Sequence, residues 1–333
     1  MNRERIQIII PVYKSEKFID RCLKSISNQT YTDYVVYMVD DCSPDNSAKI
    51  CNKYCAQDER FKLISAPKNG GAGHARNIGL DNADLENGYI AFIDSDDYIH
   101  PQYLEHLYKL LKDNDADFSW VSVHNTFEKN ALEFENVDFD TEYTYTISGH
   151  DLLLREDLRV MYLMVWGKLF KSSLWNDIRF DESYKYYEDG ATTYKVIYKA
   201  KNVVVSDIKL YNYFYSDNSA TRSDISKIRI LDGIRTETDK IDFYQANNEE
   251  DLMNMAYIAY LNTLLAAIRN GAGMGDDGRQ IRRDARMQYR KSYLKALKNN
   301  NISKGQKIKY IVYRFFPDLQ RLNIYLKGKL HRF

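Results

Sequence analysis

The chain has 333 residues and no formal net charge, because 47 basic side chains balance 47 acidic ones. Its length exceeds one average domain, so we expect either one large domain with an appendage or two domains. Apolar residues make up 44% and charged residues 28%, with only 5 Pro and 15 Gly, which excludes a fully disordered, collagen-like or linker-dominated chain.

The first third alternates short apolar runs with amphipathic stretches. Strands separated by helices predict βαβ units and a mainly parallel sheet, in which ligands bind at the carboxyl ends of the strands. The expected strands are residues 5–12, 34–40, 61–65, 88–94 and 117–123, and the expected helices begin near Phe18, Ala48, Ala72 and Pro101.

The remaining two thirds become helical toward the carboxyl end. Residues 125–147 are expected to form loops and extended segments, followed by a helix ending near Ala200 and then two strands, "NVVVSD" and "LYNYFY". Amphipathic helices are expected at 225–245, 249–270 and 279–299, with a flexible break at 271–278. We therefore expect an α/β domain over 1–223 and a helical region over 224–333.

The charge is strongly segregated. Residues 279–333 contain 16 Lys and Arg against 2 Asp and Glu, a net charge of +14, so the remainder carries −14. Cations alternate with apolar side chains, as in an interfacial helix on an anionic membrane leaflet. The tail could instead pack on the body or on a sister subunit in a homo-oligomer, and no recognised nucleic-acid module accompanies it. The apolar positions at helical spacing are Ile308, Ile311, Val312 and Phe315.

Hydropathy and cysteine content bear on the location of the protein. No run of 18 or more apolar residues occurs and the mean hydropathy is −0.55, so we expect a soluble or peripheral protein. The first apolar run ends at Pro11, which favours a first strand over a signal peptide. Four cysteines without a CxxC pair favour reduced thiols and a cytoplasmic location, peripheral on the inner face of the membrane if the tail binds lipid.

Three acidic clusters fall at the ends of expected strands or before a helix. Asp94 and Asp96 are two residues apart, so in extended backbone both carboxylates would point the same way and offer oxygen ligands to Mg²⁺ or Mn²⁺. Taken alone, each cluster is more often a solvated turn or a helix cap than a functional site. The clusters are "VDDCSPDNS" at 39–47, "IDSDD" at 93–97 and "YYEDG" at 186–190.

A glycine-rich segment, "KNGGAGHARNIGL" at 68–80, precedes an expected helix. Gly70, Gly71 and Gly73 would let backbone N–H groups approach an anion at the helix N-terminus, and Arg76 could add a bidentate phosphate contact. The segment contains neither a Walker A lysine pattern nor GxGxxG.

These motifs in this order, starting from "IIIPVY" and ending at "YYEDGATTY", resemble family 2 glycosyltransferases over roughly residues 6–223. The resemblance implies the GT-A fold, a Rossmann-like and mainly parallel sheet with flanking helices. It also implies an inverting transfer of a sugar from a nucleotide-sugar, most often a UDP-sugar, assisted by Mn²⁺ or Mg²⁺. The expected acceptor is a glycan or a lipid-linked glycan in bacterial surface polysaccharide synthesis.

The resemblance also implies roles for residues on the nucleotide side. Pro11, Val12 and Tyr13 are expected to line the nucleotide, Asp41 to accept a hydrogen bond from the uracil imide, and Arg76 to lie beside the nucleotide. The family commonly has Gly after the two Asp, where this chain has a small Cys.

On the reacting side, the resemblance places Asp94 by the ribose or the metal, and Asp96 on the metal that bridges the diphosphate. Asp189 is expected to be the catalytic base, with Glu188 as the next candidate.

Acceptor-side roles follow from "VWGKLF" at 165–170, which is similar to a family segment. Trp166 could stack on a sugar or belong to the core, and Lys168 could contact an acceptor phosphate. Arginines that the family often carries after a late strand are replaced by Phe214 and Ser216, which leaves Arg222 as a substitute for a diphosphate contact.

Two other classes of function remain open from the residues. A sugar-phosphate nucleotidyltransferase would also be α/β and use Mg²⁺, but its glycine-rich GxGTR-like signature would stand where this chain has "PVYKSEKF". A non-catalytic sugar-nucleotide-binding protein would retain the binding motifs without turnover. The chain lacks a QxxRW motif, which argues against a processive synthase.

Overall fold

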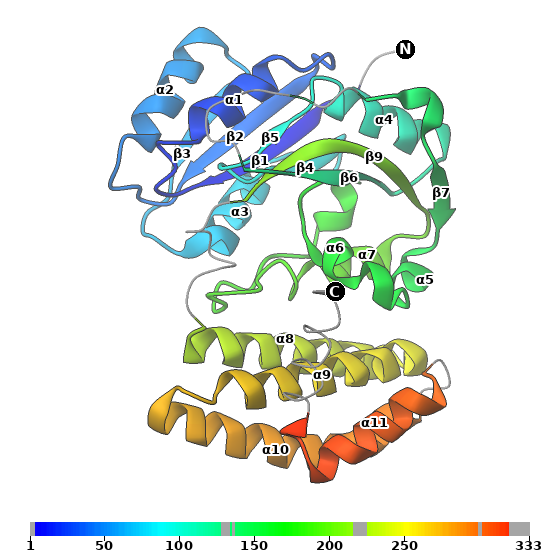
Figure 1. The fold of residues 1–333 in the computed structure, drawn as a ribbon. Coiled ribbons are helices and arrows are strands. Elements are labelled where there is room, and N and C mark those ends of the chain that lie inside the picture. The colour runs from blue at the N-terminus through cyan, green and yellow to red at the C-terminus, as the bar shows by residue number, and fades with distance from the viewer. Residues whose placement is uncertain (1–3, 128–133, 135–136, 216–224, 299–301, 320–333) are drawn as a thin grey trace, which may run out of the picture. The chain divides into compact units, whose positions relative to one another are not determined.

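The computed structural model describes residues 4–127, 134, 137–215, 225–298 and 302–319 (Figure 1). The chain divides into two compact units. The first comprises Met1–Tyr184 and Glu188–Ser223, and the second comprises Lys185–Tyr187 and Asp224–Phe333. Within the described ranges, no helix has the length and apolar character needed to cross a bilayer.

The first unit is built on one mixed sheet with the strand order β3-β2-β1-β4-β8-β6-β9-β5, in which β7 pairs with β9. The first four strands in this order are parallel, whereas β8 runs antiparallel to both of its neighbours. The predicted α/β class is therefore confirmed. The strands are β1 (Ile6–Val12), β2 (Tyr34–Asp40), β3 (Phe61–Ser65), β4 (Tyr89–Phe92), β5 (Tyr98–Ile99), β6 (Phe118–Thr126), β7 (Thr144–Ile147), β8 (Lys168–Lys171) and β9 (Val203–Phe214).

Helices cover both faces of this sheet. Ile8 and Ile10 of β1 belong to a core cluster with apolar residues of α1 and α4, while Ile9 points to the opposite face. There Gly79 of α3 leaves the space that Ile9 occupies, since a Cβ on Gly79 would lie 2.4 Å from Ile9 Cγ2. Burial on both faces explains the continuous apolar run of β1. The helices are α1 (Ile19–Ser27), α2 (Ser47–Gln57), α3 (Gly71–Asn82), α4 (Tyr103–Asp113), α5 (Gly149–Leu153), α6 (Arg159–Leu163) and α7 (Thr193–Lys199).

Two strand predictions were wrong in the second half of the sheet. "NVVVSD" and "LYNYFY" form one continuous strand, β9, because the register shift between Val121 and Val123 of β6 absorbs the irregularity between them. The sequence also did not predict β8, whose first residue is a lysine. The helix predictions for α1–α4 and α7 are confirmed to within a few residues.

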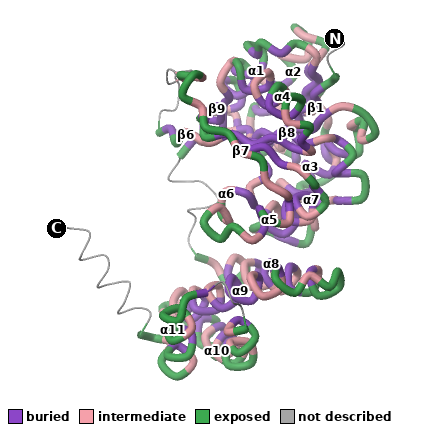
Figure 2. The backbone as a smooth tube through the Cα atoms, turned by 90° about the vertical axis from the view of Figure 1, so that its right-hand side faces the viewer, coloured by how far each residue is buried: buried purple, intermediate pink, exposed green. Residues whose placement is uncertain are grey.

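The second unit contains four helices in its described part: α8 (Lys227–Ala246), α9 (Glu250–Asn270), α10 (Gly275–Leu297) and α11 (Lys304–Phe315). The break between α9 and α10 is shorter than predicted, because α10 already begins at Gly275. Ser303 and Gln306 form a capping box at the start of α11. Figure 2 shows α11 as largely exposed. Residues 320–333 of the predicted basic tail lie outside the described part of the chain.

Candidate active site

The loops that follow parallel strands meet at one edge of the sheet. β1, β2 and β4 run in the same direction, so their carboxyl ends lie together. Ser15, which follows β1, connects these loops through hydrogen bonds. Its hydroxyl is 2.6 Å from that of Ser95, after β4, and its N–H donates to Ser47 Oγ, after β2, over 2.8 Å.

Asp94 and Asp96 lie in a tight turn rather than in the extended backbone that the sequence predicted. β4 ends at Phe92, and the N–H of Asp97 donates to the carbonyl oxygen of Asp94 over 3.0 Å. The turn is fixed by a buried pair that sequence reasoning missed. Tyr211 donates to Asp97 Oδ2 over 2.7 Å and accepts from the Asp94 N–H over 3.2 Å. In the sequence, only the presence of Asp97 in "IDSDD" and of Tyr211 in "LYNYFY" could have indicated this pair.

Asp96 is a buried carboxylate whose negative charge is compensated only in part, by the nearby Arg21 guanidinium. Burial, and next the negative charge of Asp94, raise the pKa of Asp96 to about 6. No side chain in the described ranges donates a hydrogen bond to its carboxylate; Arg21 donates instead to its backbone carbonyl, over 2.7 Å. A divalent cation would relieve both the burial and the repulsion, so these two carboxylates fit a metal that draws its remaining ligands from substrate phosphates.

Arg76 connects the two acidic clusters that the sequence placed far apart. Its guanidinium donates to Asp94 Oδ1 and to Glu188 Oε1, each over 2.8 Å, and its side chain is only 5% exposed. Both partners hold the pKa of Arg76 above its ordinary value despite burial. Arg76 is thus already bound to protein carboxylates, which differs from the phosphate contact that the sequence suggested.

Asp189 is the half-buried second acid of "YYEDG". Burial, and next the charge of Glu188, raise its pKa to about 7, while the Arg76 guanidinium opposes that rise. One carboxylate oxygen accepts the Gly190 N–H over 2.7 Å, and its backbone carbonyl accepts N–H groups at the start of α7. A carboxylate with a pKa near neutrality in a polar site suits a general base.

Asp41 holds the glycine-rich loop. Its two carboxylate oxygens accept the N–H groups of Gly70 and Gly71 over 2.8 and 2.7 Å, and its carbonyl accepts from the Asn69 amide. The Gly70 and Gly71 N–H groups, which the sequence offered to a substrate anion, therefore bind a protein carboxylate. Cys42 has a φ of +60°, which explains why glycine is common at this position.

The remaining nucleotide-side residues lie at the end of β1. Val12 is buried, Pro11 is half-buried and the Tyr13 ring is 44% exposed. Tyr13 is thus exposed at the same edge as the acidic turns, and its contact with a nucleotide stays a prediction. Arg222 and Ser216 lie outside the described residues.

Trp166 and Lys168 are core residues. Trp166 is 7% exposed and stacks on Tyr211 at a centroid distance of 4.9 Å, which supports the alternative of core packing. The Lys168 ammonium is fully buried and donates to the backbone carbonyls of Met161, Met164 and Trp166. Burial lowers the pKa of Lys168 to about 7. This placement argues against direct contact with an acceptor phosphate.

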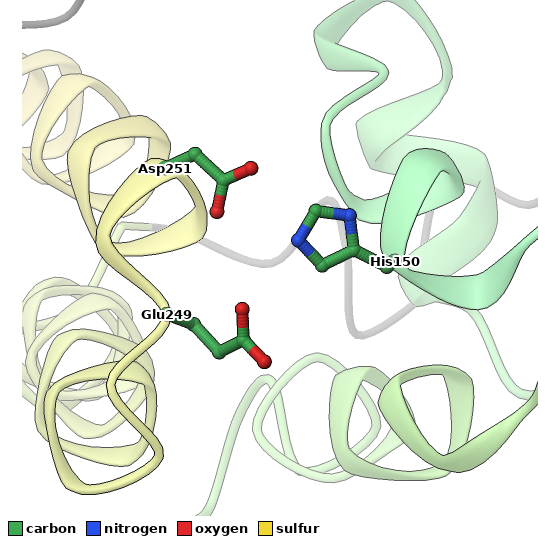
Figure 3. A group of neighbouring side chains, drawn as sticks. All are labelled: His150, Glu249 and Asp251. Atoms are coloured by element: carbon green, nitrogen blue, oxygen red, sulfur yellow. The ribbon is translucent and has the colours of Figure 1, made fainter.

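One further group of ligand-type side chains carries no assignment. Figure 3 draws three side chains of this kind: His150, Glu249 and Asp251. His150 belongs to the first unit and the two carboxylates to the second, so we assign no metal site to them.

The chain belongs to glycosyl transferase family 2, whose model matches residues 7–173. Glycosyltransferase GlyA of Streptococcus pneumoniae is 32% identical over 224 residues, which are 66% of this chain and 32% of GlyA. The poly(ribitol-phosphate) beta-N-acetylglucosaminyltransferase TarS of Staphylococcus aureus is 29% identical over 214 residues, which are 63% of this chain and 35% of TarS. The chain therefore spans about a third of the length of either relative.

Solved structures confirm the GT-A fold with its C-terminal helices. TarS 1-349 in complex with UDP-GlcNAc is 21% identical with a TM-score of 0.62, covering 84% of this chain and 89% of that one. The mannosyltransferase PcManGT from Pyrobaculum calidifontis, in complex with GDP-Man and Mn²⁺, is 15% identical with a TM-score of 0.53, covering 95% and 88%. At these identities the likeness concerns the fold alone.

Proposed function

We propose that this protein is an inverting glycosyltransferase that moves a sugar from a UDP-sugar to a hydroxyl of a glycan or lipid-linked glycan. The observation that carries the proposal is Arg76, which joins Asp94 of the β4 turn to Glu188 of the "YYEDG" loop. One site thereby holds a carboxylate pair suited to a metal–diphosphate and a separate carboxylate suited to a base. Membership of glycosyl transferase family 2 and the UDP-GlcNAc bound to TarS support this donor class.

Asp189 supplies the chemistry on the acceptor side. A sugar hydroxyl is a poor nucleophile, so a positioned carboxylate must accept its proton as it attacks the anomeric carbon. The raised pKa of Asp189 makes this carboxylate a stronger base than an exposed aspartate. A single displacement of this kind inverts the anomeric configuration.

Asp94 and Asp96 supply the donor side. They would hold Mn²⁺ or Mg²⁺, the ion present with GDP-Man in PcManGT being Mn²⁺. The ion, when bound, neutralises negative charge on the departing diphosphate. The acceptor class is suggested by TarS, whose name describes transfer to poly(ribitol-phosphate), so a polymer of polyol phosphates is a reasonable first acceptor to assay.

Release of UDP distinguishes this proposal from its alternatives. The purified protein is incubated with a panel of UDP-sugars and Mn²⁺, with and without a polyol-phosphate polymer. A transferase releases UDP slowly by hydrolysis and faster with an acceptor. A nucleotidyltransferase would release no UDP: with pyrophosphate it would convert the UDP-sugar to UTP and a sugar 1-phosphate. A binding protein would form none of these products.

We expect UDP binding to depend on a divalent cation held by Asp96. Diphosphate facing these carboxylates is repelled without a cation, so Mn²⁺ should raise UDP affinity about 10-fold or more. Asp96→Ala should abolish the increase, whereas Asp113→Ala, which removes an exposed carboxylate paired with Lys109 on α4, should retain it. Calorimetry that gives equal UDP affinity in EDTA and in Mn²⁺ would contradict the metal assignment.

We further propose that α11 docks the protein on an anionic membrane surface. One side of the helix is aromatic and buried. On this side the Tyr310 hydroxyl donates to Asn262 Oδ1 over 3.3 Å, and the Tyr310 backbone carbonyl accepts a hydrogen bond from the Tyr289 hydroxyl. The other side of the helix exposes apolar residues, and residues 304–315 contain four cations and no acid. Each cation near an anionic leaflet contributes about 1 kcal/mol. The exposed apolar residues are Ile308, Ile311, Val312, Phe315 and Phe316.

We expect the protein to co-sediment with phosphatidylglycerol vesicles but not with phosphatidylcholine vesicles, and less so at high salt. Ile308→Asn combined with Phe315→Asn should abolish binding, because the two side chains are about 60% exposed and form part of the apolar surface. The matched control is Met287→Asn with Leu294→Asn, two exposed apolar residues of α10. If vesicles never bind and the Ile308 and Phe315 changes instead dissociate an oligomer, this surface joins copies of the chain.

A further inference from the structure

The segment that directly precedes the candidate base is held by the helical unit. Lys185–Tyr187 belongs to the second unit, although Glu188 and Asp189 belong to the first. Asp232 of α8 makes the attachment, since its Oδ2 atom accepts the N–H of Lys185 over 3.1 Å and the N–H of Tyr186 over 3.0 Å. Asp232 thus fixes the backbone immediately before the candidate base.

The contact between Asp232 and the loop involves a buried charge and closely placed neighbours. Asp232 is only 8% exposed, and a buried carboxylate is costly unless charge-assisted hydrogen bonds satisfy it. The Arg229 guanidinium, one turn earlier on α8, lies 5.8 Å from the Tyr186 ring. Next to this pair Gly233 presents no side chain, and a Cβ there would lie 3.4 Å from the Tyr187 ring, in van der Waals contact. Lys185 and Tyr186 therefore contact a short stretch of α8, and the Tyr187 ring lies beside Gly233.

The loop needs such support because its backbone is strained. Tyr187 has a φ of +66°, a left-handed conformation that is unfavourable for residues other than glycine. Such a conformation persists only where the surroundings hold it. Tyr187 is the residue immediately before Glu188, so the direction in which Glu188 and Asp189 leave the loop depends on this turn.

We propose that Asp232 is a positioning residue for the transfer reaction: by fixing the N–H groups of Lys185 and Tyr186, it holds the loop in the conformation that presents Asp189 to the acceptor hydroxyl. The inference rests on the proposed function of Asp189. Misplacement of a catalytic group by about 1 Å can lower a rate about 100-fold. Loss of Asp232 should therefore lower kcat while leaving donor binding, which depends on the β4 turn, unchanged.

The test compares Asp232→Ala and Asp232→Asn with the wild-type full-length protein. Asparagine keeps an oxygen acceptor without the charge, so it should fold where alanine fails and give an intermediate effect. The matched control is Asp239→Ala on the same helix, where the carboxylate pairs with Arg235 at 3.8 Å. We expect kcat for UDP release to fall at least 10-fold in Asp232→Ala, KM for the donor and UDP affinity to stay the same, and the control to match wild type.

Hydrogen exchange supplies a readout that does not need turnover. In Asp232→Ala the amides of residues 185–187 should exchange at least 10-fold faster, with exchange in α9 unchanged. Unchanged exchange in these residues, or faster exchange with unchanged kcat, would overturn the proposal. If no donor is turned over by the wild type, the proposed function fails, and the exchange comparison still decides whether Asp232 holds the loop.

Discussion

Asp189→Asn is expected to lower turnover about 100-fold or more while UDP binding is retained. Asparagine preserves the size of the side chain and its hydrogen bond with the Gly190 N–H, but it cannot accept the proton of the acceptor hydroxyl. UDP release by the purified variant measures the first effect, and calorimetry with UDP measures the second. Asp113→Asn, an exposed aspartate on α4, is the matched control and should behave as wild type.

Near-normal transfer by Asp189→Asn would remove Asp189 from the role of base. Glu188 would then be the next candidate, although its carboxylate already binds Arg76. A parallel loss of UDP binding would instead indicate that the substitution disturbed the donor site. The two measurements together separate a chemical effect from a structural one.

Arg76→Ala should lower the free energy of unfolding by about 3 kcal/mol. This is the lower end of the range for breaking a buried ion pair, because the partners Asp94 and Glu188 are partly exposed. Three acidic side chains would then be left near one another without the cation between them. The pKa of Asp189 should rise further, because Arg76 is the charge that lowers it. Denaturant titration measures the loss of stability, and UDP release across pH measures the shift.

Two further variants test whether the effect of Arg76→Ala depends on the guanidinium group and on its buried position. Arg76→Lys keeps the positive charge but not the two-pronged guanidinium that reaches both carboxylates, so its loss should be intermediate. Lys109→Ala breaks an exposed pair on α4 and should change stability by less than about 0.5 kcal/mol. Equal stability of Arg76→Ala and wild type would show that the pairs with Asp94 and Glu188 do not hold the site together.

The first half of the sheet could be predicted because each of its strands is marked by a pattern of neighbouring residues in the sequence. β1 to β4 are apolar runs of about one strand length, and each is separated from the next by an amphipathic helix. The second half could not, because its pairing is non-local. β8 lies between β4 and β6 and is antiparallel to both. It begins with Lys168, a residue that does not indicate a buried strand, yet the Lys168 ammonium is buried and donates hydrogen bonds to three backbone carbonyls.

The sequence indicated acidic candidates for the site but not the partners that the structure gives them. The order of the motifs predicted roles for Asp41, Asp96 and Asp189, and these roles stay predictions. Arg76 and Asp41 looked like ligands for phosphate and nucleotide, whereas the structure pairs both with the protein itself. Such pairs join residues up to 112 positions apart, and no local pattern records them.

The pH dependence of UDP release tests the central claim, that Asp189 is the base, most directly. A base whose pKa is raised to about 7 is protonated, and so inactive, at lower pH. With a UDP-sugar that the wild type turns over, kcat/KM should therefore fall about 10-fold per pH unit below about 7, and this dependence should disappear in Asp189→Asn. The same acid limb in wild type and Asp189→Asn, at similar absolute rates, would contradict the account.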